Sequence, residues 1–410
     1  MTELFGNYQN EIYFAGLGGQ RPEFPVSLAE LEARARDVLS PEAYGYVVGG
    51  AGTEDTVREN LEAFRRWRLV PRLLRDVEAR DLSVEILGSR FPAPVMLAPI
   101  GIQELMHPDK EIATAKAAAS VGIPIVLSTA GSTPMEDVAE TMGDVPRWYQ
   151  LYWPRDPDLA VSLMKRAEAS GYSAIVVTVD TVTLAWRPRD LSHGFLPFLS
   201  GKGVAQYTSD PVFKAGLEKT PEEDPLAASL HWVQNFSNPA YTWNDLEFLR
   251  ANTSLPILLK GILHPDDARL AIDHGIAGII VSNHGGRQLD GEVATLDALP
   301  GVRAAVGPDI PVLLDSGIRS GSDAIKALAL GADAVLLGRP YAWGLAVGGE
   351  AGVRQVIKSF LADLDLSMGL AGMTSIGEID RACLVRIGPY PSRAYAPTEP
   401  RRRSNDVRDR

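Results

Sequence analysis

The segment GIIVSNHGGRQLD, residues 278–290, joins a short apolar run to a polar, glycine-rich stretch. The run at 278–283 has the nearly continuous apolar and β-branched composition of a strand buried on both faces of a parallel sheet. The stretch SNHGGRQLD (282–290) then places His284 before two glycines and Arg287. The segment therefore predicts both an element of the fold and a reactive site at the end of that element.

Seven further apolar runs of the same kind occur along the chain. They are PVMLAP (94–99), IPIVLS (123–128), RWYQLY (147–152), AIVVTVD (174–180), PILLKG (256–261), PVLLDS (311–316) and AVLLGR (334–339). Stretches rich in Ala and Leu, such as 265–272 and 322–328, separate most of the runs and predict helices. Eight strands alternating with helices predict the α/β class and a (β/α)₈ TIM barrel.

A doubly wound sheet is the competing fold. Such a sheet usually carries G-x-G-x-x-G after its first strand when it binds a dinucleotide. PVMLAPIGIQ (94–103) has no such pattern, and the chain has no Walker A sequence. The barrel is therefore the favoured architecture.

Two regions and a tail interrupt the regular alternation. Residues 1–93 are expected to form an N-terminal extension packed on the barrel, with a helix over 27–39. The barrel is expected over 94–388, with a long insertion at 181–255 after the fourth strand that would act as a lid. Residues 389–410 are rich in Pro and Arg and are expected to be a disordered tail.

Composition excludes several classes of protein. Forty basic and fifty-two acidic side chains give a net charge of −12, which argues against a nucleic-acid partner. No run of about 18 apolar residues is present, so we expect no membrane span. The first residues lack the features of a signal peptide, and Cys383 is the single cysteine, which favours a reducing cytoplasm. The histidines show no metal-ligand spacing, so no metal site is predicted.

The loops after the last two strands suggest an anion site. In barrels of this kind chemistry collects at the carboxyl ends of the strands, and phosphate often binds after the seventh and eighth. The loops DSGIR (315–319) and GR (338–339) combine glycine with Arg319 and Arg339. They predict a phosphate site, although ordinary loop salt bridges are the alternative.

Three other strand ends carry groups suited to catalysis. Lys260 ends the fifth strand, where it could form a Schiff base, hold a developing negative charge or pair with a carboxylate. An unperturbed histidine has a pKa of about 6.5, which suits His284 to act as a base, and Asp180 is placed to orient it. Arg287 offers a fork for a carboxylate. A phosphate-bearing group, a base, a cation and a carboxylate clamp together fit FMN and a 2-hydroxy acid.

SNHGGRQLD resembles the signature of the FMN-dependent 2-hydroxy-acid oxidases and dehydrogenases, which are barrel enzymes. The resemblance runs from Tyr46 to Arg339. Within that family, NYQNEIYFAGL (7–17), WRPRDL (186–191), FLPFLSG (195–201) and the long insertion resemble the lactate 2-monooxygenase branch.

The resemblance implies a role for each matching residue. His284 would be the base with Asp180 as its partner, and Tyr152 would bond the substrate oxygen. Arg187, Arg287 and Tyr46 would hold the substrate carboxylate, and Lys260 would lie at the N1/O2 edge of the flavin. The expected cofactor-binding residues are Pro99, Ile100, Gly101, Ser128, Gln150, Thr178, Lys260, Ser282, Asp315, Ser316, Gly317, Ile318, Arg319, Gly338 and Arg339. A homo-oligomer, tetrameric or octameric, is also implied.

Two positions bear on the substrate and the product. Ala130 stands where many relatives carry a bulkier residue, so substrates longer than lactate are expected. Gly101 stands where simple oxidases tend to have Ala, although a tight turn with positive φ would also explain a glycine. The expected reaction is oxidation of an L-2-hydroxy acid by O₂ with decarboxylation of the retained keto acid. Release of keto acid and hydrogen peroxide is the alternative.

Three other functions are less favoured. A membrane-associated dehydrogenase would need a basic or apolar insertion, whereas this insertion contains EKTPEEDP (218–225). An FMN barrel isomerase would not need the spacing of His284 and Arg287. A non-catalytic barrel would be colourless when purified.

Overall fold

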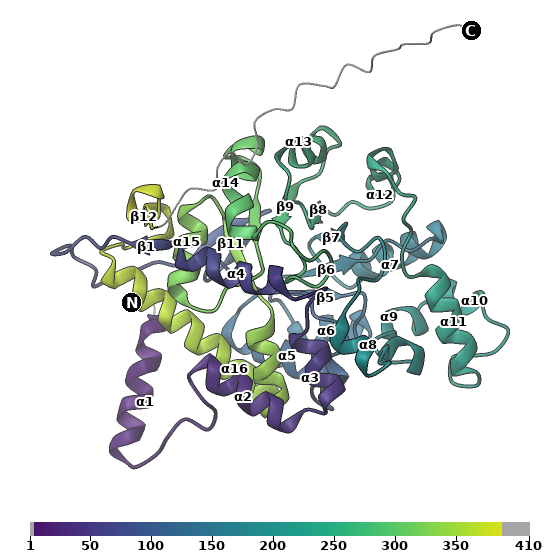
Figure 1. The fold of residues 1–410 in the computed structure, drawn as a ribbon, viewed down its shortest axis with the longest axis horizontal. Helices are drawn as coiled ribbons and strands as arrows, with labels where there is room; N and C mark the ends of the chain where they lie inside the picture. Colours follow the sequence, from purple (N-terminus) through teal and green to yellow (C-terminus); the bar gives the residue numbers. More distant parts are fainter. Residues whose placement is uncertain (1–3, 388–410) are drawn as a thin grey trace, which may run out of the picture.

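The computed structural model describes residues 4–387, so the tail predicted at 389–410 lies outside the described residues. Eight parallel strands close into a barrel in the order β10-β11-β4-β5-β6-β7-β8-β9 (Figure 1). Each strand lies within one of the apolar runs, so the predicted (β/α)₈ barrel is confirmed. The strands are β4 (Val95–Leu97), β5 (Ile125–Ser128), β6 (Arg147–Leu151), β7 (Ile175–Thr178), β8 (Ile257–Lys260), β9 (Gly278–Val281), β10 (Val312–Leu314) and β11 (Ala334–Leu337).

Helices follow the strands and form the outer ring. They are α5 (Lys110–Val121), α6 (Met135–Met142), α7 (Pro157–Ala169), α12 (Leu246–Ala251), α13 (Pro265–Asp273), α14 (Thr295–Val306), α15 (Gly321–Ala329) and α16 (Arg339–Leu370). The helix expected over 322–328 begins at Gly321, because Ser320 and Asp323 form a reciprocal capping box at its start. The long α16 is broken at Gly348 and Gly349, which have non-helical angles.

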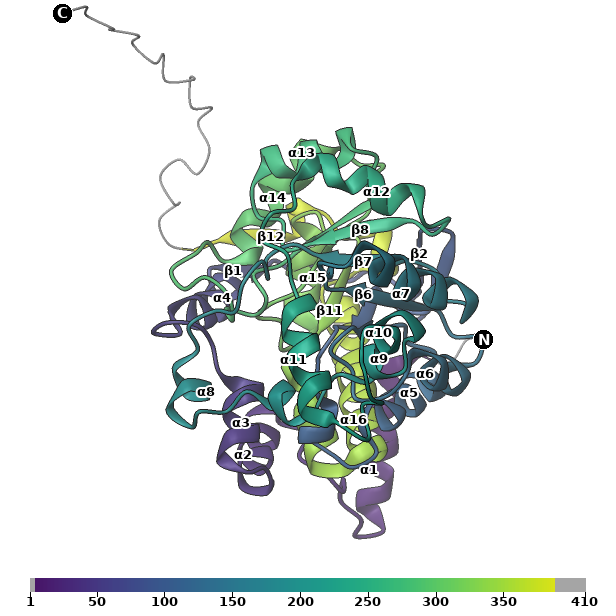
Figure 2. The same ribbon diagram turned by 90° about the vertical axis from the view of Figure 1, so that its right-hand side faces the viewer.

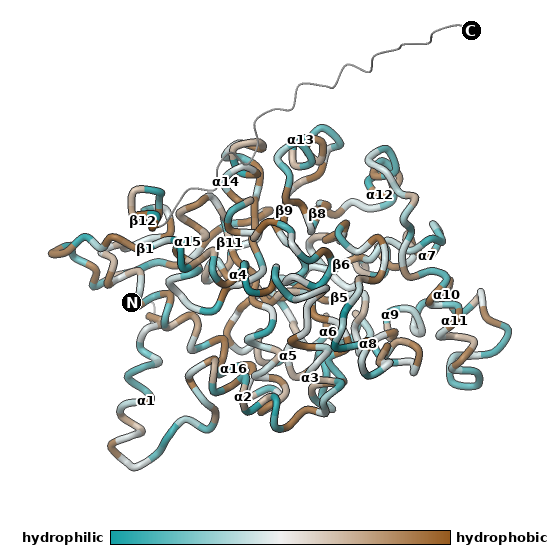
Figure 3. The backbone as a smooth tube through the Cα atoms, viewed as in Figure 1, coloured by the Kyte–Doolittle hydropathy of each residue, from teal (hydrophilic) through white to brown (hydrophobic). Residues whose placement is uncertain are grey.

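Alternation along each strand divides the apolar core in two. Residues such as Val95, Leu127 and Val177 pack outward in the cluster shared with the helices. Their neighbours, such as Met96, Val126 and Val176, form a separate cluster inside the barrel. Because successive side chains of a strand point to opposite faces, an unbroken apolar run fills both cores. Figure 3 shows these hydrophobic segments gathered in the centre of the molecule.

A hairpin contributes to the interior cluster. Strands β2 (Val84–Ile86) and β3 (Ser89–Phe91) pair antiparallel, and Ile86 and Phe91 belong to that cluster. The ring of Phe91 lies 6.1 Å from that of Trp148.

The same alternation selects the residues at the mouth of the barrel. The residue two positions after the last inward-facing apolar residue of each strand points to the same side and lies at the mouth. These residues are Ala98, Ser128, Gln150, Thr178, Lys260, Ser282, Asp315 and Gly338. Neighbouring strands are in register here, with Ser128 opposite Gln150 and Thr178 opposite Lys260. The polar layer of the mouth is therefore a direct consequence of strand periodicity.

The chain before the barrel wraps around it. This part comprises η1 (Phe5–Asn7), α1 (Tyr8–Leu17), α2 (Leu28–Val38), α3 (Pro41–Val48), α4 (Asp55–Arg65) and β1 (Trp67–Leu69). Strand β1 pairs with β12 (Leu384–Arg386), while α2 packs on α16 and α4 on α14. The helix expected over 27–39 is α2, and the side chain of Ser27 caps it. Helix α1 projects from the body and leaves Tyr13, Phe14 and Leu17 exposed (Figures 1 and 2).

The insertion after β7 is largely helical. It contains α8 (Pro188–Ser192), η3 (Pro197–Ser200), α9 (Ala205–Thr208), α10 (Pro211–Ala215), α11 (Pro225–Asn235) and η4 (Trp243–Asp245). Helices α9, α10 and α11 lie together on one side of the barrel, whereas α12 lies in the outer ring beside α13 (Figures 1 and 2). Within residues 4–387, no helix combines the length and apolar character needed to cross a membrane.

Candidate active site

A cavity of about 1070 Å³, measured with its open mouth, lies at the carboxyl ends of the barrel strands. Segments far apart in the chain meet there, from Tyr46 in α3 to Arg339 at the start of α16. The expected site residues that line it are Tyr46, Pro99, Ile100, Gly101, Tyr152, Arg187, Lys260, His284, Arg287, Asp315, Ser316, Gly317, Ile318, Arg319, Gly338 and Arg339. The remaining expected residues, Ser128, Gln150, Thr178, Asp180 and Ser282, are not among those that line this cavity.

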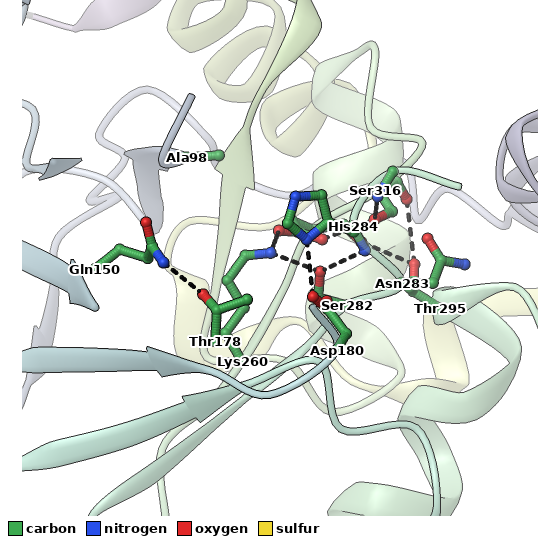
Figure 4. Close-up of polar contacts among 12 residues, drawn as sticks. Ala98, Gln150, Thr178, Asp180, Lys260, Ser282, Asn283, His284, Thr295 and Ser316 are labelled. Carbon is green, nitrogen blue, oxygen red and sulfur yellow. Dashed lines mark hydrogen bonds and ion pairs between the residues drawn. The ribbon is translucent and has the colours of Figure 1, made fainter. Parts of the chain in front are cut away.

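His284 and Asp180 form a hydrogen-bonded pair at the mouth of the barrel. The Nδ1 atom of His284 lies 2.8 Å from Oδ1 of Asp180 (Figure 4). The Nε2 atom lies 3.4 Å from the Tyr152 hydroxyl. The Thr181 hydroxyl donates to the same Asp180 oxygen at 2.8 Å. Because the carboxylate accepts from Nδ1–H, the basic lone pair of the ring is on Nε2, on the side of Tyr152.

The charges around this pair keep His284 neutral and Asp180 ionised. Burial lowers the pKa of His284 below its ordinary value, and the positive charges of Lys260 and Arg187 add to the effect, whereas Asp180 opposes it. Burial acts to raise the pKa of Asp180, but His284 and Lys260 outweigh it and hold that pKa below the usual range. A neutral imidazole beside an anionic carboxylate is the protonation state of a general base.

His284 also has an uncommon backbone conformation. Its φ is 57°, in the left-handed region, and its backbone N–H donates to the Ser282 hydroxyl at 3.1 Å. Histidine is one of the residues that populate this region more readily than most. Gly285 and Gly286 follow with φ of 68° and 76°, so the loop turns sharply after β9. The turn therefore favours the sequence His-Gly-Gly.

A chain of hydrogen bonds lies beneath the cavity. Ser128 donates to Gln150, whose amide donates to Thr178 at 2.9 Å (Figure 4). Lys260 donates to Ser282 at 2.8 Å and forms an ion pair with Asp315 at 3.1 Å. Burial acts to lower the pKa of Lys260, but Asp315 and Asp180 raise it above its ordinary value. The lysine is therefore a protonated, buried cation beside the cavity, which is unsuited to forming a Schiff base.

Two guanidinium groups face the part of the cavity next to His284. Arg287 donates from one nitrogen to the carbonyls of Tyr46 and Gly49, at 2.6 and 2.7 Å, and lies over the Tyr46 ring. Burial and the nearby charge of Arg187 lower the pKa of Arg287 to about 10. Within residues 4–387, neither arginine has a carboxylate within 4.0 Å. Half-buried cations that have no anion beside them favour binding of a carboxylate from outside.

The loops after β10 and β11 fit a phosphate by the same argument. Burial, together with Arg287 and Arg319, lowers the pKa of Arg339 to about 9, and neither Arg319 nor Arg339 pairs with a carboxylate of the described chain. The backbone N–H groups of Gly317 and Ile318 have no acceptor in that part of the chain. A side chain at Gly317 would come within 2.4 Å of the Asn60 carbonyl, which explains the glycine. This donor set suits the phosphate of FMN.

Gly101 has a different explanation from the tight turn considered above. Its φ is not positive; Ile102 has the left-handed value of 58°. A Cβ on Gly101 would lie 2.8 Å from the Cβ of Ala130 and 3.1 Å from its carbonyl oxygen. Gly101 and Ala130 are therefore packed against each other, and both line the cavity.

Sequence reasoning missed part of the apolar wall. Among the residues that it did not name are Ala98, Met106, Leu184, Phe198 and Phe236, all of which line the cavity. Ala98 could have been found, because it lies two residues beyond the inward-facing Met96. Phe198 and Phe236 lie in the insertion, where no strand period marks an inward side.

Comparisons with known proteins agree with this geometry. A family model described as FMN-dependent dehydrogenase matches residues 35–386. An FMN-dependent alpha-hydroxy acid dehydrogenase of Penicillium citrinum is 46% identical over 391 residues, covering 94% of this chain and 97% of the relative. An L-lactate oxidase of Lysinibacillus sphaericus (strain C3-41) is 43% identical over 376 residues, covering 92% and 96%. A crystal structure of mandelate oxidase superposes with a TM-score of 0.78 at 42% identity, covering 87% of this chain and 97% of that one.

The fold and the comparisons define a (β/α)₈ flavoprotein whose cavity brings His284 together with several arginines. The chain belongs to the FMN-dependent dehydrogenase family, and FMN is its cofactor. It is an oxidoreductase of the 2-hydroxy-acid class.

Proposed function

We propose that the protein oxidises an L-2-hydroxy acid, lactate or a longer analogue, with O₂ and decarboxylates the keto acid before releasing it. The observation that carries this proposal is one cavity lined by His284, which Asp180 holds from behind, and by two guanidinium groups that have no carboxylate partner within residues 4–387. Those groups match a substrate with a hydroxyl next to a carboxylate. The relatives named as lactate oxidase and mandelate oxidase support the same substrate class.

Each residue then has a part in the reaction. Arg187 and Arg287, with Tyr46, would hold the substrate carboxylate and so fix the α-carbon. Nε2 of His284 would take the hydroxyl proton, and Asp180 would stabilise the imidazolium that results. Tyr152 stays protonated, because burial raises its pKa, and can donate to the substrate oxygen.

FMN, when bound, supplies the oxidant that accepts the hydride of the α-carbon and passes the electron pair to O₂. Lys260 offers its buried positive charge to the reduced cofactor. Ser128, Gln150, Thr178, Ser282 and the backbone at 99–101 would hold the ring, and the loops at 315–319 and 338–339 its phosphate.

The apolar wall supports a substrate larger than lactate. Ala130, Met106, Leu184, Phe198 and Phe236 line the cavity together with His284. Two of these are aromatic and Ala130 is small, so a longer apolar substituent would find both volume and contact surface. The homo-oligomer and the cytoplasmic location expected from the sequence also belong to this proposal. The exposed aromatic residues of α1 support the first, and the single cysteine supports the second.

The direct test uses a panel of 2-hydroxy acids of increasing side-chain length. Purified protein should be yellow, release FMN on denaturation, and lose its flavin colour when an L-2-hydroxy acid is added without oxygen. Oxygen uptake and product analysis under air then give the ratio of shortened carboxylic acid to free keto acid. A protein whose flavin is reduced by no member of the panel would disprove the proposal.

The fate of the keto acid should depend on Gly101. The retained keto acid reacts with hydrogen peroxide to give a carboxylic acid one carbon shorter, carbon dioxide and water. Replacing Gly101 with Ala would push a methyl group against Ala130, and the crowded loop should retain product less well. We expect Gly101→Ala to shift the output towards free keto acid and hydrogen peroxide, measured without catalase and with the keto acid trapped.

The control for this change is Gly101→Ala combined with Ala130→Gly. The second substitution removes the Ala130 methyl group, which the new methyl group at position 101 would otherwise contact. We expect the double variant to recover part of the wild-type product ratio. If wild type itself releases peroxide and keto acid in equal amounts, the protein is a plain oxidase, as the relatives with that name would suggest.

Asp180 should control the acid limb of the pH profile. Its charge raises the pKa of His284 against the opposing effect of burial, so Asp180→Asn should lower that pKa further. Because His284 must be neutral to act, the fall of kcat/KM in acid should move to lower pH. The plateau should drop by about 100-fold or more, because Nδ1–H loses its anionic partner. An acid limb that moves to higher pH would contradict this assignment.

A further inference from the structure

Gln288 belongs to the SNHGGRQLD segment, and the reaction described above gives it no role. Its side chain joins two loops. The amide nitrogen donates to the carbonyls of Asp180 and Thr183, at 3.0 and 3.2 Å. The amide oxygen accepts from Nη2 of Arg187 at 2.7 Å.

Arg187 depends on this contact for its orientation. It is the N-cap residue of the short helix α8 and follows an exposed stretch that includes Leu184 and Trp186. Its Nε donates to the carbonyl of Arg287 at 2.9 Å, and its Nη2 is held by Gln288. Its Nη1 has no acceptor within residues 4–387. Because Arg187 lines the cavity, this nitrogen is available to a ligand there. The hydrogen bonds of Nε and Nη2 to residues 287 and 288 therefore fix the direction of Nη1.

A neutral amide suits this position better than a carboxylate. Burial lowers the pKa of Arg287, and repulsion from the charge of Arg187 lowers it further. Amide and carbonyl oxygens bind the Arg187 guanidinium without cancelling its charge. A glutamate at 288 would form an ion pair with Arg187 and compete with an incoming carboxylate.

We propose that Gln288 is a positioning residue that holds Arg187 against the catalytic loop, so that the free nitrogen of Arg187 faces the substrate carboxylate. This inference rests on the proposed function, because it concerns the same substrate. It makes Gln288 a determinant of carboxylate affinity and leaves proton removal to His284.

The test is Gln288→Met, which preserves the length of the side chain and removes all three hydrogen bonds. The KM for the best 2-hydroxy acid should rise about 10- to 100-fold, the usual range for a hydrogen bond to a charged group. The kcat should change much less. Titration of the flavin spectrum with pyruvate should show the same loss of affinity without turnover. Gln355→Met is the matched control, because Gln355 also donates to two distant carbonyls, those of Phe24 and Pro25.

A double-mutant cycle separates positioning from general damage. If Gln288 acts through Arg187, Gln288→Met should add almost nothing to the KM and pyruvate affinity of Arg187→Met. Additive effects would overturn the inference, as would a shifted acid limb of kcat/KM, which would mean that Gln288 acts through Asp180. A wild-type KM in Gln288→Met would overturn it too. If no 2-hydroxy acid reduced the wild-type flavin, the proposed function itself would fail, which is a distinct result.

Discussion

Replacing His284 with Ala should leave FMN bound and lower the rate of flavin reduction by about 10²–10⁴-fold, the usual contribution of a general base. The reason is that Nε2 of His284 is the free basic atom next to the Tyr152 hydroxyl, while Nδ1 is held by Asp180. FMN should remain, because the expected phosphate loops at 315–319 and 338–339 do not use the imidazole. The measurement is anaerobic stopped-flow reduction by a 2-hydroxy acid, with flavin content determined in parallel.

The left-handed backbone conformation of His284 makes a second variant necessary. Its φ of 57° is less favourable for Ala than for His, so His284→Ala carries a cost in stability as well. Asn tolerates this conformation, and His284→Asn should therefore fold normally and still lose the base. His274→Ala, at the end of α13, is the control and should reduce at the wild-type rate. Near-normal reduction in His284→Asn would remove His284 from the mechanism.

Replacing Arg287 with Met should weaken binding of the substrate carboxylate by about 10²–10³-fold, the effect of truncating one partner of a buried charge pair. Arg287 is half-buried, has no protein carboxylate within 4.0 Å in the described chain and lines the cavity beside His284. KM should rise accordingly. The dissociation constant of pyruvate, read from the flavin spectrum, should rise by the same factor.

Structural damage can be separated from lost binding here. Arg287 also donates to the carbonyls of Tyr46 and Gly49, and Met would remove both bonds, although Gly49 would keep its bond from Arg339. Arg287→Lys keeps a cation near these carbonyls but lacks the planar fork, so it should restore stability more than affinity. Arg354→Met, which breaks an ion pair on α16 with Glu350, should change neither constant. A wild-type pyruvate affinity in Arg287→Met would refute the carboxylate assignment.

The sequence by itself determined the barrel and the layer of polar residues at its mouth. A residue pattern with period two decides which side chains point inward, and this is a local property of a strand. Ser128, Gln150, Thr178, Lys260 and Ser282 could therefore be placed from their runs. The pairing of His284 with Asp180 follows from the rule that the carboxyl ends of parallel strands meet at one end of a barrel.

Tertiary structure decided the contacts between loops. Tyr46 meets Arg287 across 241 residues of chain, and Gln288 holds Arg187 across 101. No local sequence pattern predicts either contact, because each depends on how α3 and the insertion pack over the closed barrel. The contact of Gly101 with Ala130 is of the same kind: two small residues on neighbouring loops fit because the strands beneath them are in register. Side-chain direction is set within a strand, whereas loop contacts are set by the packing of the whole barrel.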